Sequence, residues 1–233
     1  MTKRISKGIC ALCQGEFSRA NMTRHLEACQ RKAADAERSA GRRAGRTMKL
    51  FHLVVEGRDL PMYWMHLHVR TGITLADLDE FLRETWLECC GHMSAFEIGA
   101  QRYLSGAGIY FEPAPSEHSL RVRLDRVFHP GLSCLYEYDF GTTTELRLKV
   151  VAEETREATG QSIQLLASNT PPLIPCGICG KPATSVCTVC VYEEAGWLCA
   201  ECAKTHECGA EMLLPVVNSP RVGMCAYGAG YAG

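Results

Sequence analysis

The sequence lacks the features that would place the chain in a membrane or on a secretory route. None of its apolar runs approaches the roughly 20 residues of a membrane-spanning helix. Its first ten residues, MTKRISKGIC, are basic and lack the apolar segment of a secretory signal. We therefore expect a cytoplasmic protein.

Several well-known catalytic motifs are also missing. The chain has no GxxxxGK(S/T) phosphate-binding loop and no GxSxG nucleophile elbow. Asp139 to Gly141 reads DFG, the magnesium motif of kinases, but no glycine-rich loop and no HRD sequence accompany it. We interpret this tripeptide as a strand end that turns at Gly141, and the sequence names no reaction.

A net charge of −1 conceals a strong asymmetry. Residues 1–49 carry twelve Lys/Arg and four Asp/Glu, whereas the remainder carries thirteen against twenty-two. A basic end on an acidic body suggests an arm that contacts something anionic. The alternative interpretation is a solvated linker.

Cysteine is abundant and unevenly placed. Eleven of the fourteen cysteines lie in the two end regions, mostly as C-x2-C pairs, and the others are Cys89, Cys90 and Cys134. Without a secretory signal, this pattern favours zinc in a reducing cytoplasm over a disulfide scaffold. Adjacent Cys89 and Cys90 are interpreted as buried packing residues.

The chain divides into four segments by composition. They are a cysteine/histidine module (1–30), a basic linker (31–47), an apolar-patterned core (48–168) and a cysteine-rich tail (169–233). The linker has almost no large apolar side chain, and its Ala and Arg content allows a helix. Strand and helix periods coexist in the core, which predicts an α+β fold with a mainly antiparallel sheet and packed helices.

Two runs at the start of the core, MKLFHLVVEG and MYWMHLHVR, have the composition of strands. The second predicts Tyr63, Met65, Leu67 and Val69 on one face, with Trp64, His66 and His68 on the other. A helix follows, with Thr74 as N-cap, Asp77 in the capping position and Gly91 as a stop. Its apolar stripe consists of Leu75, Leu78, Leu82 and Trp86. The runs LSCLYEYDF and TTELRLKVVAE predict a hairpin around Gly141.

The tail contains three C-x2-C pairs followed by one histidine and one cysteine. The eight residues are Cys176, Cys179, Cys187, Cys190, Cys199, Cys202, His206 and Cys208. A C-x2-C turn presents two thiolates to one tetrahedral Zn²⁺, so eight ligands predict two closed structural zinc sites.

The order of the pairs resembles the cross-braced B-box, MYND and RING modules. That resemblance implies one zinc on Cys176, Cys179, Cys199 and Cys202, and another on Cys187, Cys190, His206 and Cys208. The separation of His206 and Cys208 is shorter than those modules usually have. Cys225 is therefore an alternative ligand in place of one of them.

The N-terminal module reads CALCQGEFSRANMTRHLEAC. Cys10 and Cys13 supply one ligand pair, while His25 and Cys29, four residues apart, share one face of the following helix. The module resembles a C2HC variant of the C2H2 zinc finger, with Phe17 and Met22 at its core positions. Arg19, Asn21 and Arg24 are candidates for nucleic-acid contact from its helix, or ordinary polar surface residues.

Part of the core resembles the plasmid pRiA4b ORF-3-like family, which is also found as an insertion-element passenger protein. The runs that carry the resemblance are LPMYWMHLHV, TLADLDEFLRETWLECCGHMSAFEI and YEYDFGTTTELRLKVV. The matching positions are Pro61, Trp64, Thr74, Leu75, Leu78, His92, Tyr136, Tyr138, Asp139, Phe140 and Gly141. Many members continue after the glycine with Asp, Trp and His, where this chain has threonines. The resemblance implies an α+β core and an association with mobile elements, without an established activity.

The leading hypothesis is a multi-zinc adaptor holding about three zinc ions, which binds nucleic acid or a protein. DNA or RNA would contact the basic N-terminal region, including Arg42, Arg43 and Arg46, and a protein would contact the tail module. The main alternative is an enzyme with a site in the core. Its candidate residues are His66, His68, His92, Tyr138 and Asp139. A third hypothesis is a structural domain whose finger mediates self-association.

Overall fold

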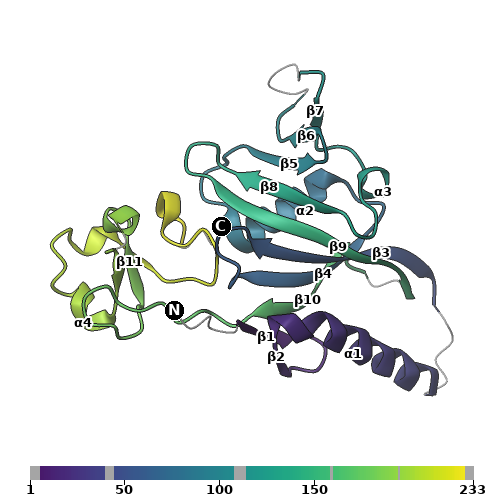
Figure 1. Ribbon diagram of the computed structural model, residues 1–233, viewed down its shortest axis with the longest axis horizontal. Coiled ribbons are helices and arrows are strands. Elements are labelled where there is room, and N and C mark those ends of the chain that lie inside the picture. The colour runs from purple at the N-terminus through teal and green to yellow at the C-terminus, as the bar shows by residue number, and fades with distance from the viewer. Residues whose placement is uncertain (1–5, 40–44, 108–113, 158–159, 194, 229–233) are drawn as a thin grey trace.

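A ten-stranded sheet with helices on both of its faces dominates the computed structural model, and the cysteine-rich tail forms a smaller lobe beside one end of the sheet (Figure 1). The structure describes residues 6–39, 45–107, 114–157, 160–193 and 195–228. The predicted α+β class with a mainly antiparallel sheet is confirmed.

The elements up to the end of the sheet occur in the following order. They are β1 (Lys7–Cys10), β2 (Glu16–Ser18), α1 (Arg19–Ser39), β3 (Thr47–Gly57), β4 (Trp64–Arg70), α2 (Leu75–Leu82), the π-helix η1 (Arg83–Leu87), β5 (Ser94–Ile98), β6 (Gln101–Leu104), β7 (Glu117–Ser119), α3 (Leu124–Val127), β8 (Ser133–Tyr138), β9 (Thr144–Glu157) and β10 (Ile163–Asn169).

The strand order across the sheet is β2-β1-β10-β4-β3-β9-β8-β5-β6-β7. Every neighbouring pair is antiparallel except β6 and β7. Strands β8 and β9 form the predicted hairpin around Gly141, with Tyr138 opposite Thr144. Strands β3 and β9 lie at the centre of this order, and the pairing between them is the longest in the sheet.

Strand β4 is buried on both faces. Met65, Leu67 and Val69 belong to the main core, where Leu75, Leu78 and Leu82 of α2 cover them. Trp64 points to the opposite face because side chains alternate along a strand. There it packs against Met22 and Leu26 of α1. Helices α1 and α2 therefore cover opposite faces of the sheet at the same strand.

The N-terminal module is built into the sheet. Strand β1 pairs with β10, with Gly8 opposite Asn169, and it pairs on its other side with β2. The indole Nε1 of Trp64 donates a hydrogen bond to Ser6 Oγ at 2.8 Å. Helix α1 continues through Ser39, so the segment predicted as a linker begins as the last part of the finger helix.

Helix α2 begins as the sequence predicts and ends differently. Thr74 and Asp77 form a complete capping box, and Leu75, Leu78, Leu82 and Trp86 are all buried. After Leu82 the helix widens into the π-helix η1, which ends when the amide of Glu88 donates to the carbonyl of Arg83. The helix therefore stops before Gly91, whose positive φ of 73° belongs to the turn that follows.

The tail forms a three-stranded sheet in the order β12-β11-β13, with short helical turns around it. Its elements are β11 (Ser185–Cys187), the 3-10 helix η2 (Cys190–Glu193), β12 (Trp197–Leu198), α4 (Ala200–Ala203), the 3-10 helix η3 (Ala210–Met212), β13 (Leu213–Pro215) and the 3-10 helix η4 (Met224–Ala226).

The segment after β13 returns to the core. Val222 joins the main apolar cluster, and Ser219 Oγ donates to the carbonyl of Trp86 at 2.6 Å. The side-chain Nδ2 of Asn169 donates to Asn218 Oδ1 at 2.7 Å. Tail and core are thus packed together. In the described residues, no helix has the length and apolar character needed to cross a bilayer.

Gly8 gives a direct test of how the finger is attached. A Cβ at this position would lie 2.2 Å from the carbonyl oxygen of Ser168 and 2.5 Å from the Trp64 ring. Gly8→Ala should therefore push β1 away from β10 and lower the free energy of unfolding by about 1–3 kcal/mol. Urea denaturation measures this change. Gly160→Ala is the control, because a Cβ there meets no atom within 4 Å and equal losses would contradict the prediction.

Candidate metal centres

The first cluster of possible metal ligands lies in the finger. Cys10 and Cys13 flank the turn between β1 and β2, while His25 and Cys29 lie one helical turn apart on α1. Cys13 Sγ lies 3.4 Å from His25 Nε2. The backbone N–H of Gly15 lowers the pKa of Cys13, which favours its thiolate form. The Phe17 ring stacks on the imidazole of His25 at 3.6 Å and fixes its orientation.

The second cluster unites the first and third C-x2-C pairs of the tail. Cys179 Sγ lies 3.6 Å from Cys199 Sγ and 3.7 Å from Cys202 Sγ, and Cys176 completes the group. Backbone N–H groups of Cys199 and Cys179 lower the pKa of Cys176 to about 6. Thiolate is the form that binds a metal, and the backbone favours that form at Cys176.

The third cluster interlocks with the second. Cys190 Sγ lies 3.6 Å from both His206 Nε2 and Cys208 Sγ, and Cys187 is the fourth member. Burial raises the pKa of Cys187, but hydrogen bonds from the backbone of Cys190 and Val189 outweigh it and lower the value to about 7. The tail is therefore cross-braced, in the partition that the resemblance to B-box, MYND and RING modules implies.

The separations of the ligand atoms fit a shared metal ion. A disulfide requires a sulfur–sulfur distance of about 2.05 Å, whereas thiolates on a tetrahedral ion at ~2.3 Å are ~3.8 Å apart. The sulfur–sulfur distances of 3.6–3.7 Å match the second geometry. All fourteen cysteines are free, and within each cluster the ligand atoms lie within 4.8 Å of one another.

A fourth cluster was not predicted from the sequence. Cys89, Cys90 and His92 meet Cys225, the residue proposed as an alternative ligand for the tail sites. The sequence signal is weak, because Cys89 and Cys90 are not a C-x2-C pair and Cys225 lies far along the chain. Thirteen of the fourteen cysteines belong to the four clusters, and Cys134 is buried in the main core.

The candidate nucleic-acid contacts differ in whether their side chains are accessible to a partner. Arg19 forms an ion pair with Glu56 of β3, so its charge is used within the protein. Asn21 and Arg24 lie on the exposed side of α1, where Arg24 donates to Asn21 Oδ1 at 3.3 Å. Arg46 is exposed at the start of the core, while Arg42 and Arg43 lie outside the described residues.

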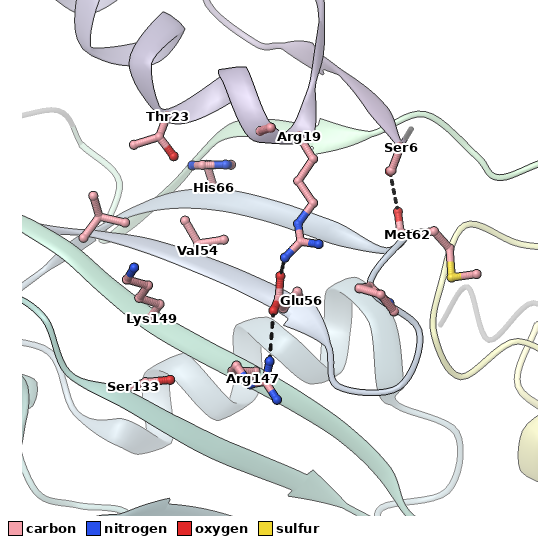
Figure 2. A pocket seen from close by; sticks show the side chains of 13 residues that line it. Ser6, Arg19, Thr23, Val54, Glu56, Met62, His66, Ser133, Arg147 and Lys149 are labelled. Carbon is pink, nitrogen blue, oxygen red and sulfur yellow. Dashed lines mark hydrogen bonds and ion pairs between the residues drawn. The ribbon is translucent and has the colours of Figure 1, made fainter. Parts of the chain in front are cut away.

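A pocket of about 930 Å³ opens between the start of α1 and the sheet. Figure 2 shows Arg19 and Arg147 converging on Glu56, with Lys149 and His66 further along the wall. The Arg147 guanidinium lies 3.6 Å from the Glu56 carboxylate. Three cations and one carboxylate give this pocket an excess of positive charge.

The five residues of the enzyme hypothesis do not come together. His66 and His68 lie on the face of β4 that α1 covers, whereas Tyr138 belongs to the main core on the opposite face. His92 contacts Tyr138 and lies 3.6 Å from Asp139 Oδ2. The predicted set is thus split between two sites, and only His66 lines the pocket of Figure 2.

A buried histidine pair lies under α1 instead. His52 Nε2 is 2.9 Å from His66 Nδ1, and both side chains are almost completely buried. Burial lowers the pKa of His52 to about 4 and that of His66 to about 3. Both imidazoles are therefore neutral at pH 7.

Comparison with known proteins gives one family match. A family model described as plasmid pRiA4b ORF-3-like protein matches residues 51–179, which is more than half of the chain. The crystal structure of a protein of unknown function from Methanosarcina mazei Go1 has a TM-score of 0.45 and 18% identity, covering 52% of this chain and 69% of that one. No curated protein matches.

The cross-braced arrangement predicts which substitutions remove a metal ion. Cys179→Ser takes one ligand from the second cluster and should lower the metal content by about one ion per chain, because a closed tetrahedral site needs four ligands. Elemental analysis of protein purified without chelator measures the loss. Cys134→Ser is the matched control, since this cysteine lies outside every cluster. An unchanged metal content in Cys179→Ser would contradict the assignment.

The histidine pair predicts a loss of stability in acid. The folded-state pKa values of about 4 and about 3 lie below the unfolded value, so protons bind the unfolded chain first as pH falls. Stability should therefore decrease from pH ~6.5 downward, by about 2 kcal/mol per histidine between pH 7 and 5. His66→Gln should show a shallower decline than the unsubstituted protein in urea titrations at each pH. Parallel declines would contradict this account.

Proposed function

The chain belongs to the plasmid pRiA4b ORF-3-like protein family, and from that premise we propose that it is a cytoplasmic multi-zinc adaptor of mobile elements that contacts nucleic-acid phosphates. In this proposal the core is a rigid platform, zinc holds the finger and the tail, and the outer side of α1 forms the contact surface. The exposed cations on α1 are the observation that carries it.

Zinc is the metal that suits the three predicted clusters. Each offers four protein ligands drawn from cysteine and histidine, which is the donor set of closed structural zinc sites. With four ligands supplied by the protein, no position remains open for water or substrate. The ion therefore supplies folding stability in modules too small to bury a large apolar core.

The outer side of α1 presents cations that form no ion pair within the part of the chain that the structure describes. Arg24, Arg31 and Lys32 are exposed, and none of the three forms an ion pair with another described residue. Arg24 and Arg31 are seven residues apart, which places them on the same side of the helix. A row of this kind suits the regular phosphates of a nucleic-acid backbone.

The ion pair of Arg19 helps to hold α1 with its cations facing away from the sheet. Its ion pair with Glu56 ties the first turn of α1 to β3, so the helix is held against the platform at that end. The side of α1 that faces away from the sheet then remains accessible to a partner. A single finger supplies little base readout, so we expect weak sequence preference.

The tail module supports a second candidate function, which is contact with a protein. Ile178 and Val189 sit inside the first and second C-x2-C turns with exposures of 66% and 55%, and Tyr192 nearby has 59%. Exposed apolar and aromatic side chains are available to enter the apolar centre of an interface with a protein. This surface lies on the tail lobe, whereas the cations lie on α1.

The salt dependence of binding tests the nucleic-acid proposal. The combined variant Arg24→Gln, Arg31→Gln, Lys32→Gln should bind duplex DNA more weakly, and the slope of log affinity against log salt should become shallower by about 0.9 for each phosphate that the protein no longer neutralises. Fluorescence anisotropy across a salt series measures both quantities. Because the substitutions are on exposed side chains, folding should be unaffected.

The matched control removes three exposed cations elsewhere. Arg121, Arg126 and Lys204 lie outside α1, and their replacement by Gln changes net charge by the same amount. This variant should keep nearly the full slope. Equal losses of affinity in both variants would show that binding depends on net charge and not on the α1 surface. Unchanged binding by the α1 variant would contradict the proposal.

A further inference from the structure

Cys89, Cys90, His92 and Cys225 come from two distant parts of the chain. The first three follow the π-helix η1 in the core, and Cys225 lies in η4 after the tail lobe. Cys90 Sγ lies 3.5 Å from Cys225 Sγ, and His92 Nε2 lies 3.3 Å from each of these two sulfur atoms. These separations approach the ~3.5–3.8 Å expected between ligands of one tetrahedral ion and exceed a disulfide bond.

We propose that these four residues bind a fourth metal ion, of the zinc class, which fastens the returning tail to the core. The site goes beyond the three sets that the proposed function requires. Three thiolates and one imidazole form a closed donor set for Zn²⁺, and binding releases the thiol protons to solvent.

The backbone around the site is held in conformations that need support. Cys225 and Ala226 both have positive φ values, 47° and 57°, although neither is glycine. Two consecutive residues of this kind are strained, and such strain persists where the surroundings fix it. A metal bond to Cys225 provides that fixation.

A second element shapes the turn that carries Cys89 and Cys90. The Glu88 carboxylate accepts hydrogen bonds from the amide of Gly91 and from the hydroxyl of Tyr138 at 3.0 Å. This closes the turn from Glu88 to Gly91, with Gly91 in the left-handed region. The turn thereby brings the sulfur atoms of Cys89 and Cys90 to the same cluster.

Arg221 completes the support from the tail side. Its side chain is completely buried, and Nη2 donates to Cys89 Sγ at 3.4 Å and to Asp139 Oδ2 at 2.7 Å. This contact from a buried, fixed side chain holds the Cys89 sulfur beside the other three members of the cluster. Partners around metal ligands orient and tune them in this way.

The consequence is a clasp between the core and the tail. Cys90 and Cys225 are separated by 135 positions, so one ion bound to both closes most of the central domain and the tail into a single loop. With Val222 in the main core and Ser219 bonded to Trp86, the ion fixes the place where the tail lobe rejoins the sheet.

Metal content is the first test. Protein purified without chelator should contain about four metal ions per chain, and Cys225→Ser should contain about three. His92→Cys retains a ligand and should keep the fourth ion, whereas His92→Ala should lose it. Cys134→Ser is the matched cysteine control and should keep all of them.

Limited trypsin digestion is the second test. Arg221 is buried, so cleavage after it reports release of the tail. The fragment should appear faster in Cys225→Ser than in the unsubstituted protein or Cys134→Ser. A metal content that falls in Cys179→Ser but not in Cys225→Ser would overturn the clasp and leave the proposed function intact. A Cys90–Cys225 disulfide, detected by mass spectrometry without reduction, would also overturn it.

Discussion

The burial of β4 on both faces is the constraint on which the rest of the structure depends. A strand alternates its side chains, so Met65 and Leu67 enter the main core while Trp64 and the neighbouring histidines face the other way. That second face needs a cover, and α1 supplies it with Met22 and Leu26. The finger is therefore a layer of the domain as well as a small module with a candidate metal site.

This dual role explains why the finger helix has two unlike sides. Its inner side carries Met22, Leu26 and the candidate ligand His25, and its outer side carries Arg24 and Arg31. Seen in Figure 1, α1 lies beside β1 and β2, the two strands at this edge of the sheet. The candidate metal ligands of the finger and its attachment to the sheet consequently involve the same helix, whose attachment fixes the direction in which its cations point.

Sequence reasoning worked where the signal is local. The two-residue period gave the faces of β4, and the Thr74–Asp77 spacing gave the capping box. Sequence reasoning did not predict which element covers the face of β4 that carries Trp64. No local pattern around Trp64 indicates that Met22 of α1 packs against it. Sequence reasoning placed Arg19 among the candidate nucleic-acid contacts. The ion pair of Arg19 with Glu56 joins two separate elements, α1 and β3, so spacing along the chain does not reveal it. The C-x2-C spacings led to three of the clusters because most of their ligands are close in sequence.

The fourth cluster shows why a nonlocal site escapes such reasoning. Adjacent cysteines after a helix, such as Cys89 and Cys90, are ordinarily interpreted as packing residues. The sequence around Cys225 does not indicate that it meets them. Only the return of the tail, through Val222 and Ser219, brings Cys225 to Cys90. The buried Arg221 lies in the same returning segment and contacts both Cys89 and Asp139. The family match ends at residue 179, so Cys225 and Arg221 lie outside the matched segment, while their partners Cys89, Cys90, His92 and Asp139 lie within it. The site thus depends on how this particular tail packs against a core of the family.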